Sequence, residues 1–382
     1  MQVHSFYLFS WTDIPNDEQA EWPFHRVTYS RERARDLYEA YITQIERSEE
    51  LGFDGVLLNE HHYSAYSMDP SPIVLGSNIA ARTSDLRIGF LGNVIPIREH
   101  PIRVAEEIAV LDTISGGRVI AGMARGIPKE HLAYNVDGPL GDGPDHSRSR
   151  FEEAVRLVQR AWTADDPFDW DGEHFQYEDV YIWPKPFQEP RPEMWMPASS
   201  ERSLRFAAEH RLAVACAGTT DDMRDGFETF ERIAEEEFGW SPPLDMRVFP
   251  RRIFVGETTE DARETAREHM EFHWKRLFGG VMKGTAVRAA GDTRWDPEVH
   301  ASELSPYVQS QMDFDFEAAV DSGAVAVGEP AEVLSIIEEQ YEAIDGAGHL
   351  ACTIHHGDAP HETTMESLEH FGQEVLPELK KL

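Results

Sequence analysis

The sequence predicts a single (β/α)₈ barrel that spans residues 1–382, and three observations support this. Short apolar runs rich in β-branched and aromatic residues alternate with longer stretches of helical period. Strands that alternate with helices are joined by right-handed crossovers and form a parallel sheet. Eight such units favour a closed barrel over an open sheet, and no Gly/Ser-rich linker divides the chain.

The expected strands are short and recur along the whole chain. They are Val3–Leu8, Gly55–Leu58, Arg87–Gly92, Val119–Ala124, Glu193–Pro197, Leu212–Ala217, Met246–Val255 and His349–Ile354. Expected helices follow most of them, at Ser71–Ala81, Val104–Thr113, Ser147–Trp162, Glu201–Glu209, Asp221–Phe238 and Thr259–Leu277. The first long helix is expected to begin after Ser30, whose hydroxyl can accept backbone N–H bonds, and to end at Gly52.

Two segments interrupt this alternation. Trp11–Tyr29 is a long, mostly polar loop after the first strand, and Gly279–Ala324 follows the seventh helix with several charges and no clear period. A structureless stretch of that length inside a domain is usually a functional lid or a mobile insertion, although an inert surface excursion is the alternative. We expect Gly279–Ala324 to be a lid, with Gly279-Gly280 as its hinge.

The charge balance excludes some classes of function. Lys and Arg number 35 against 70 Asp and Glu, which gives a net charge of −35. Such a surface repels nucleic acids and anionic lipid headgroups. The sequence has no apolar run long enough to span a membrane, and its first residues lack the basic start of a signal peptide. We therefore expect a cytoplasmic protein. Whether the acid excess reflects a high-salt habitat is left open by charge alone.

Polar residues follow the second and third strands, at the end of a barrel where active sites lie. The second strand leads into Glu60-His61-His62-Tyr63. Histidine changes charge near neutral pH and commonly transfers protons, although a solvated surface pair would look the same. The third strand ends in Leu91-Gly92-Asn93, where a glycine indicates either close approach of a ligand or a simple turn.

A second group of residues predicts an anion site. Arg125 follows the fourth strand, and a guanidinium there suits a bidentate anion. Ser199, Ser200 and Ser203 lie where the fifth strand meets a helix, so hydroxyls and free N–H groups can cradle an anion there. The alternative for Ser199 and Ser200 is simple helix capping, and the alternative for Arg125 is a solvated charge at the rim of the barrel. Arg148, which also follows the fourth strand, strengthens the anion interpretation.

We expect no metal site. Only Cys216 and Cys352 are present, so a cysteine zinc site and a disulfide framework are both excluded. His355-His356 and His361-Glu362 come after the last strand and are dense in potential ligands. Neighbouring residues on a strand point to opposite faces, however, and rarely share one ion.

The ordered set of motifs resembles the bacterial luciferase-like flavin monooxygenases over nearly the whole chain. The motifs that carry the resemblance are Glu60-His61-His62-Tyr63, Leu91-Gly92-Asn93, Glu99–Glu107, Leu111-Asp112-x-x-Ser115-Gly116-Gly117-Arg118, Gly122–Gly126, Ser147-Arg148, His273-Trp274, Val327-Gly328-x-Pro330-x-Glu332 and Gln373–Pro377. Each motif is weak alone, whereas the ordered set is specific. The fold of that family, a (β/α)₈ barrel, agrees with the pattern of strands and helices.

The resemblance implies roles for individual residues. His61 matches the histidine used beside the flavin for oxygen chemistry and proton transfer, and Glu60 and Asn93 lie in the same motifs and are included among the cofactor-binding residues. Leu91-Gly92 matches a non-prolyl cis peptide beneath the flavin ring. The remaining matches hold the FMN phosphate or lie next to it: Arg125, Arg148, Ser199, Ser200 and Ser203. Gly279–Ala324 matches the mobile loop of the family.

The resemblance also implies a reaction and its partners. The expected activity is a monooxygenase that uses reduced FMN from a separate flavin reductase to insert one oxygen atom of O₂ into a small organic substrate through a flavin hydroperoxide. A homodimer is implied as well. No Gly-x-Gly-x-x-Gly dinucleotide fingerprint is present, in agreement with nicotinamide being used by the reductase.

Two other functions stay open on the same fold. One is deazaflavin-dependent hydride transfer, and the other is non-catalytic flavin binding. Two departures from luciferase itself make light emission from a long-chain aldehyde an unfavoured role. Ala124 replaces a reactive cysteine, and Gly218 falls near a tryptophan position.

Overall fold

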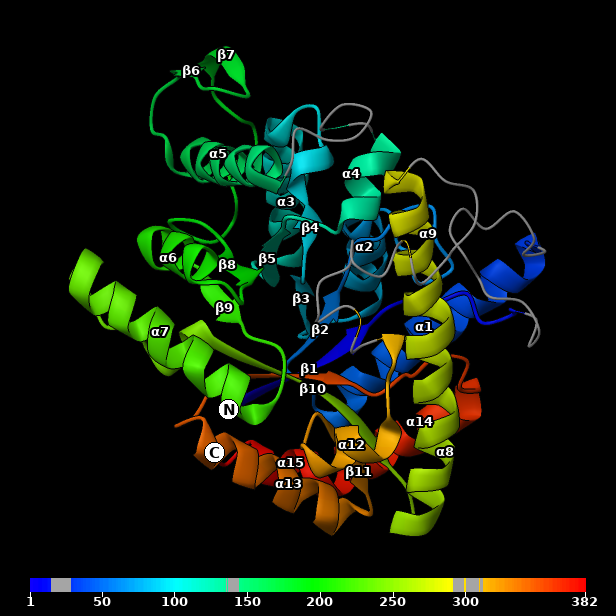
Figure 1. Cartoon of the computed structure of the whole chain (residues 1–382). Helices are drawn as coiled ribbons and strands as arrows, with labels where there is room; N and C mark the ends of the chain where they lie inside the picture. Colours follow the sequence, from blue (N-terminus) through cyan, green and yellow to red (C-terminus); the bar gives the residue numbers. More distant parts are fainter. Residues whose placement is uncertain (15–28, 135, 137–143, 291–298, 300–308, 310–311) are drawn as a thin grey trace.

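A closed ring of parallel strands forms the centre of the molecule, with helices around it (Figure 1). The computed structural model describes residues 1–14, 29–134, 136, 144–290, 299, 309 and 312–382. In order of pairing the ring contains β1 (Gln2–Tyr7), β2 (Gly55–Leu58), β3 (Arg87–Phe90), β5 (Val119–Ala124), β8 (Glu193–Pro197), β9 (Ala213–Ala215), β10 (Arg247–Val255) and β12 (His349–Thr353). Because β12 pairs with both β10 and β1, the ring closes. The predicted (β/α)₈ barrel is confirmed.

The ring strands are the eight that the sequence predicts, with boundaries that shift by a few residues at most. Four short strands were not predicted: β4 (Asn93–Val94), β6 (Phe168–Asp171), β7 (Gln176–Val180) and β11 (Val325–Gly328). Strands β6 and β7 form an antiparallel hairpin, and β11 adds to the final residues of β10. Strand β11 lies between the predicted insertion Gly279–Ala324 and the helix expected from Pro330, in a segment for which the sequence predicted no element.

Helices cover the outside of the ring (Figure 1). The longer ones are α1 (Arg31–Leu51), α2 (Pro72–Arg82), α3 (Pro101–Ser115), α5 (Pro144–Thr163), α6 (Glu201–His210), α7 (Thr220–Phe238), α8 (Thr259–Glu271), α9 (Gly279–Ala289), α13 (Pro330–Ala343) and α14 (His361–His370). Short helices are α4 (Pro128–Tyr134), α12 (Phe316–Asp321) and α15 (Leu376–Leu379). The predicted caps of α1 are confirmed, since Ser30 Oγ accepts from Arg33 N and Gly52 adopts a φ of 93°.

One glycine decides how closely β3 and β5 approach. A Cβ atom built on Gly122 would overlap the carbonyl oxygen of Phe90, so no other residue fits between these strands. The chain turns immediately after Phe90, at Leu91 and Gly92. Gly122 therefore positions this turn against the mouth of the barrel.

The start of the expected lid is helical, which corrects the prediction of an irregular segment with a glycine hinge. Helix α8, a π-helical segment at Phe272–Phe278 and α9 follow one another without a break, and Gly279 has a helical φ of −58°. Apolar side chains explain this, because Val281, Met282 and Ala286 are buried in the core. Residues 291–298, 300–308 and 310–311, as well as 15–28 of the expected first loop, lie outside the described residues.

Among the helices of the described ranges, none combines the length and the apolar character needed to cross a lipid bilayer.

Candidate active site

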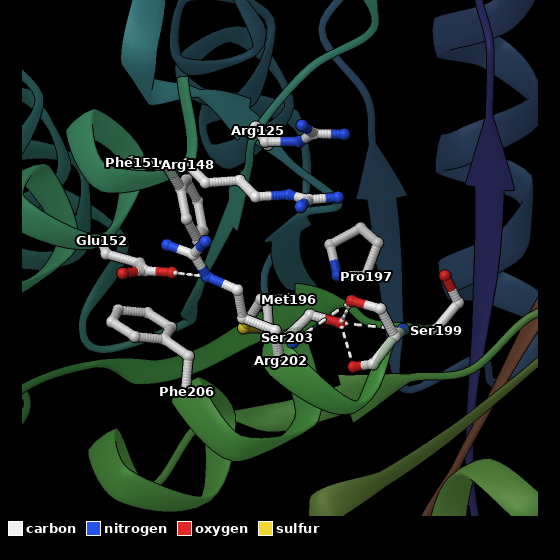
Figure 2. A pocket seen from close by; sticks show the side chains of 11 residues that line it. Arg125, Arg148, Phe151, Glu152, Met196, Pro197, Ser199, Arg202, Ser203 and Phe206 are labelled. Atoms are coloured by element: carbon white, nitrogen blue, oxygen red, sulfur yellow. Dashed lines mark hydrogen bonds and ion pairs between the residues drawn. The ribbon is translucent and has the colours of Figure 1, made fainter. Parts of the chain in front are cut away.

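A cavity of about 210 Å³ brings the predicted anion-binding residues together (Figure 2). Its lining contains all five of them, Arg125, Arg148, Ser199, Ser200 and Ser203. The structure adds residues that the sequence did not single out, among them Glu152, Met196, Pro197 and Arg202. The predicted clustering of these residues is thus confirmed, while their binding of phosphate stays a prediction.

Local structure explains why these side chains meet. Ser200 caps the N-terminus of α6, and its hydroxyl and that of Ser203 form a reciprocal capping box. Arg125 directly follows β5, and its guanidinium lies 3.5 Å from Ser147 Oγ on α5. Arg125 and Arg148 extend into the space above Pro197 and Ser203 (Figure 2).

The third arginine of this cavity faces elsewhere. The guanidinium of Arg202 turns toward Glu152, at 2.9 Å (Figure 2). Two guanidinium groups thus converge on a capped helix N-terminus, an arrangement that suits a phosphate.

A larger cavity of about 690 Å³ adjoins the first. Both cavities are lined by Pro197, at the end of β8. Phe6, Ala215 and Thr353 contribute from the carboxyl-terminal parts of other ring strands, so this cavity lies at the mouth of the barrel. Most of its lining is apolar, and part of it comes from the C-terminal portion of the insertion, residues 313–324. A flat apolar ring can therefore occupy the mouth while a phosphate attached to it reaches the first cavity.

The turn after β3 forms part of the larger cavity through Leu91. The peptide bond between Leu91 and Gly92 is cis, as the resemblance implied. Leu91 N donates to Leu58 O at 2.6 Å, which ties this turn to the end of β2. Asn93 is fully buried, and its Nδ2 donates to Gly122 O at 3.0 Å while its Oδ1 has no partner among the described residues.

His61 is not among the residues that line either cavity, and it faces α4. Its Nδ1 is 3.2 Å from Glu130 Oε1, and its ring packs edge-on against Tyr66 at 4.8 Å between centroids. Burial would raise the pKa of Glu130, but the hydrogen bond and charge of His61 and the charge of Lys129 outweigh it and lower that pKa to about 2. These contacts therefore favour the ionised form of Glu130.

Glu60 is not among the residues that line either cavity. Its Oε1 lies 2.6 Å from His62 Nε2 and 2.6 Å from the Arg98 guanidinium. Its Oε2 accepts from Val94 N at 2.8 Å. These contacts hold the segment after β3 against the end of β2. The geometry favours a positioning role for Glu60 over the direct cofactor contact that we expected from its motif.

The sequence did not reveal the contribution of α4. This helix carries Lys129 and Glu130, and His131 Nε2 lies 2.9 Å from Arg125 O, so α4 contacts both His61 and the loop of the anion site. Pro128 at the first helical position was an available signal for a helix here. Adjacent charged residues normally indicate a solvated face, and only the folded structure shows them buried.

The histidines after the last strand have structural partners. His355 Nε2 lies 3.1 Å from Tyr41 Oη, and His356 Nε2 lies 3.0 Å from Ile253 O. Burial is the largest cause that lowers the pKa of His355 to about 4 and that of His356 to about 3. Both rings are therefore neutral members of the core at neutral pH.

Comparison with known proteins decides the family. The model of the luciferase-like monooxygenase family matches residues 22–346. The chain belongs to this family. It is 29% identical over 342 residues to an uncharacterized protein of Sinorhizobium fredii, covering 89% of this chain and 91% of that protein.

Three further proteins to which the chain is similar are informative. The oxygenase component of a flavin-dependent trigonelline monooxygenase from Acinetobacter baylyi is 25% identical over 355 residues, covering 90% of each protein. The oxygenating constituent of 3,6-diketocamphane monooxygenase from Pseudomonas putida, solved in complex with FMN, superposes with a TM-score of 0.75 at 20% identity and covers 99% of this chain and 98% of its own. An F420-dependent secondary alcohol dehydrogenase shares the fold with a TM-score of 0.67 at 17% identity, covering 98% of each chain. The chain is an enzyme of the flavin-dependent monooxygenase and oxidoreductase class.

We predict that Glu60→Gln destabilises the folded protein by roughly 3 kcal/mol, because the fully buried Glu60 carboxylate accepts hydrogen bonds from Arg98 and Val94 N that an amide cannot fully replace. Urea denaturation followed by tryptophan fluorescence measures the loss. Glu99→Gln is the matched control, since the Glu99 side chain is 90% exposed and its loss should cost less than about 0.5 kcal/mol. Equal stability of the two variants would contradict the role assigned to Glu60.

Proposed function

We propose that this luciferase-like monooxygenase is the oxygenase of a two-component system, in which a separate reductase supplies reduced FMN and one oxygen atom of O₂ is transferred to a small organic substrate. The main support is the position of the two adjoining cavities. One offers two arginines and a capped helix N-terminus, and the other is largely apolar and borders the Leu91–Gly92 turn and the strand ends. The name of the trigonelline relative, an oxygenase component, supports a separate reductase.

The residues present fit FMN. Arg125, Arg148 and the serines at the start of α6 would hold the phosphate, and Leu91 would contact the flat ring system. The unpartnered buried Oδ1 of Asn93 is a further polar atom beside this turn. Reduced FMN, when bound, supplies the two electrons that activate O₂. The apolar part of the larger cavity would exclude water around the bound ring, and His61 would take up or give a proton at the mouth of the barrel.

The phosphate assignment predicts that Arg148→Ala weakens FMN binding and leaves riboflavin binding unchanged. A charge-assisted hydrogen bond contributes about 1.5–3 kcal/mol, so the Kd for FMN should rise roughly 10- to 100-fold. Riboflavin has the same ring system but no phosphate, so its affinity does not depend on this contact. Quenching of flavin fluorescence gives both Kd values.

Arg202→Ala is the control for that experiment, because the Arg202 guanidinium pairs with Glu152 at 2.9 Å and turns away from Arg148 in the cavity (Figure 2). Its effect on FMN affinity should be smaller than that of Arg148→Ala. An equal loss of FMN and riboflavin affinity in Arg148→Ala would contradict a phosphate site here.

Deazaflavin-dependent hydride transfer is the second candidate, and the shared fold of the F420-dependent dehydrogenase supports it. The acidic tail of such a cofactor needs basic side chains beyond those that hold one phosphate. Arg251 and Arg252 line the larger cavity, but they are accompanied there by Asp222, Asp313 and Asp315, in a chain of net charge −35. We therefore rank it below FMN. Titration of both cofactors against the same protein separates the two candidates. A non-catalytic flavin carrier is the third, and in that case His61→Ala would change no turnover.

We also propose that the insertion closes the site. Its described C-terminal part lines the larger cavity, and Phe314 stacks on Trp274 with 5.9 Å between ring centroids. Phe314→Ala should admit water, so that more hydrogen peroxide is released for each NADH consumed in the reductase-coupled assay. Leu244→Ala, an exposed leucine outside the cavity lining, is the control. Unchanged peroxide release in Phe314→Ala would contradict closure by this segment.

The remaining proposed partner is a second copy of the chain. Val110 and Ile114 on α3 are 44% and 64% exposed, and Phe187, which lies against Gly117 just after α3, is 61% exposed. Apolar side chains gathered in this way are typical of an interface. Light scattering should give twice the chain mass of 43.4 kDa for the wild type and the monomer mass for Ile114→Glu. A monomeric wild type would contradict the proposed dimer.

A further inference from the structure

A buried ion pair lies directly behind His61. Lys129 and Glu130 are consecutive residues of α4, and both side chains are completely inaccessible, with 3.1 Å between Lys129 Nζ and Glu130 Oε1. Burying two charges costs several kcal/mol for each ion unless additional hydrogen bonds compensate them. Burial of this pair does not by itself stabilise a short helix such as α4. The contacts of Lys129 and Glu130 with other residues therefore indicate the role of the pair.

The contacts of the pair converge on His61 and the residue after it. Glu130 Oε1 lies 3.2 Å from His61 Nδ1, and Glu130 Oε2 accepts from Ile127 N at 3.0 Å. Lys129 Nζ donates to the carbonyl oxygen of His62. The pair therefore holds the His61 ring from one side and the backbone that carries it from the other.

The charge of Glu130 determines which ring nitrogen of His61 carries hydrogen. An ionised carboxylate only accepts hydrogen bonds, so the Nδ1 that faces it must be protonated. In the neutral ring Nε2 is then the atom without hydrogen. Nε2 makes no hydrogen bond to a described residue, and the His61 side chain is 17% exposed, so Nε2 is the nitrogen left for chemistry.

We infer that Glu130, which lies between His61 Nδ1 and Lys129, is a positioning residue that fixes His61 as its Nδ1–H tautomer and leaves Nε2 to exchange the proton. This inference rests on the proposed function only for the use of that proton. In the step itself one N–H bond forms or breaks at Nε2, the hydrogen bond between Nδ1 and Glu130 is kept, and nothing is oxidised or reduced. A carboxylate at Nδ1 also stabilises the imidazolium that forms when Nε2 takes up a proton.

The tautomer can be measured on the flavin-free chain. Ring ¹⁵N chemical shifts of histidine-labelled protein, at about pH 8 where most histidines are neutral, distinguish a protonated from an unprotonated nitrogen, and His61→Gln identifies the signals of His61. We expect Nδ1–H in the wild type and in Glu130→Asp. In Glu130→Gln the amide can donate or accept, so we expect the Nε2–H form to appear.

Glu130→Gln leaves Lys129 buried without its carboxylate partner and can therefore unfold the protein. A second variant tests the inference in that case. Lys129→Met combined with Glu130→Gln removes both charges with little change in volume, and replacing a buried pair in this way is often neutral for stability. The double variant should also lose the Nδ1–H preference. If His61 keeps a pure Nδ1–H tautomer in both variants, Glu130 does not set it and the inference is overturned.

Kinetics separates action through His61 from a merely structural effect. Glu130→Gln and His61→Gln should each change the rate at which O₂ reoxidises protein-bound reduced FMN by at least about tenfold. Their combination should change it no further than His61→Gln alone. If the rate change in the double variant equals the product of the two single changes, the inference is overturned. If no variant alters this rate although the tautomer responds as expected, the proposed function fails and the positioning role of Glu130 stands.

Discussion

The contact between β5 and the end of β3 is the constraint on which the candidate site depends. The carbonyl oxygen of Phe90 occupies the volume that a side chain at position 122 would need. Because Gly122 allows this approach, the chain can turn at Leu91 directly over the barrel, where Leu91 N bonds to the end of β2. Glu60 Oε2 accepts from Val94 N in the segment after this turn, so the end of β2 is tied to the same point of the ring. The strands therefore determine the position of the backbone and apolar surface at the barrel mouth.

Local signals explain how much of the site could be predicted from the sequence. A serine before a helix and an arginine after a strand are readable without tertiary information, and Arg125, Arg148, Ser199, Ser200 and Ser203 do meet in one cavity. Glu130 and Lys129 carry the opposite signal, since charged neighbours in a chain with 70 acidic residues normally face solvent. Their burial depends on how α4 packs, which no local pattern encodes.

The insertion Gly279–Ala324 also shows that local sequence patterns do not encode tertiary packing. The sequence of Gly279–Ala324 has two adjacent glycines and no sustained period, so it predicted a loop. In the structure tertiary packing overrides that weak preference, because burial of Val281, Met282 and Ala286 stabilises α9 through both glycines. The ring strands were predictable for the converse reason: strong apolar runs such as Val119–Ala124 agree with their buried environment.

Histidine and carboxylate side chains pair at both ends of the barrel, but they come from different elements at each end. Near the start of the strands, His4 Nε2 lies 3.0 Å from His349 Nδ1, and His349 Nε2 lies 3.5 Å from Glu193. Burial would raise the pKa of Glu193, but His349 and Arg87 outweigh it and lower it to about 2. Arg87 belongs to β3 and Glu193 to β8, so this network joins ring strands.

At the mouth, by contrast, Glu130 and Lys129 come from a short helix after β5 and contact the loop after β2. Burial lowers the pKa of Lys129, and the charge of Glu130 opposes that shift. Glu130 thus favours the charged form of Lys129, while His61 and then Lys129 favour the charged form of Glu130, at a site where burial alone would favour the neutral forms. An apolar pair would pack there with less desolvation, but it would offer Nδ1 of His61 no acceptor. The buried charges are therefore best explained by the ring that they hold rather than by the stability of the barrel.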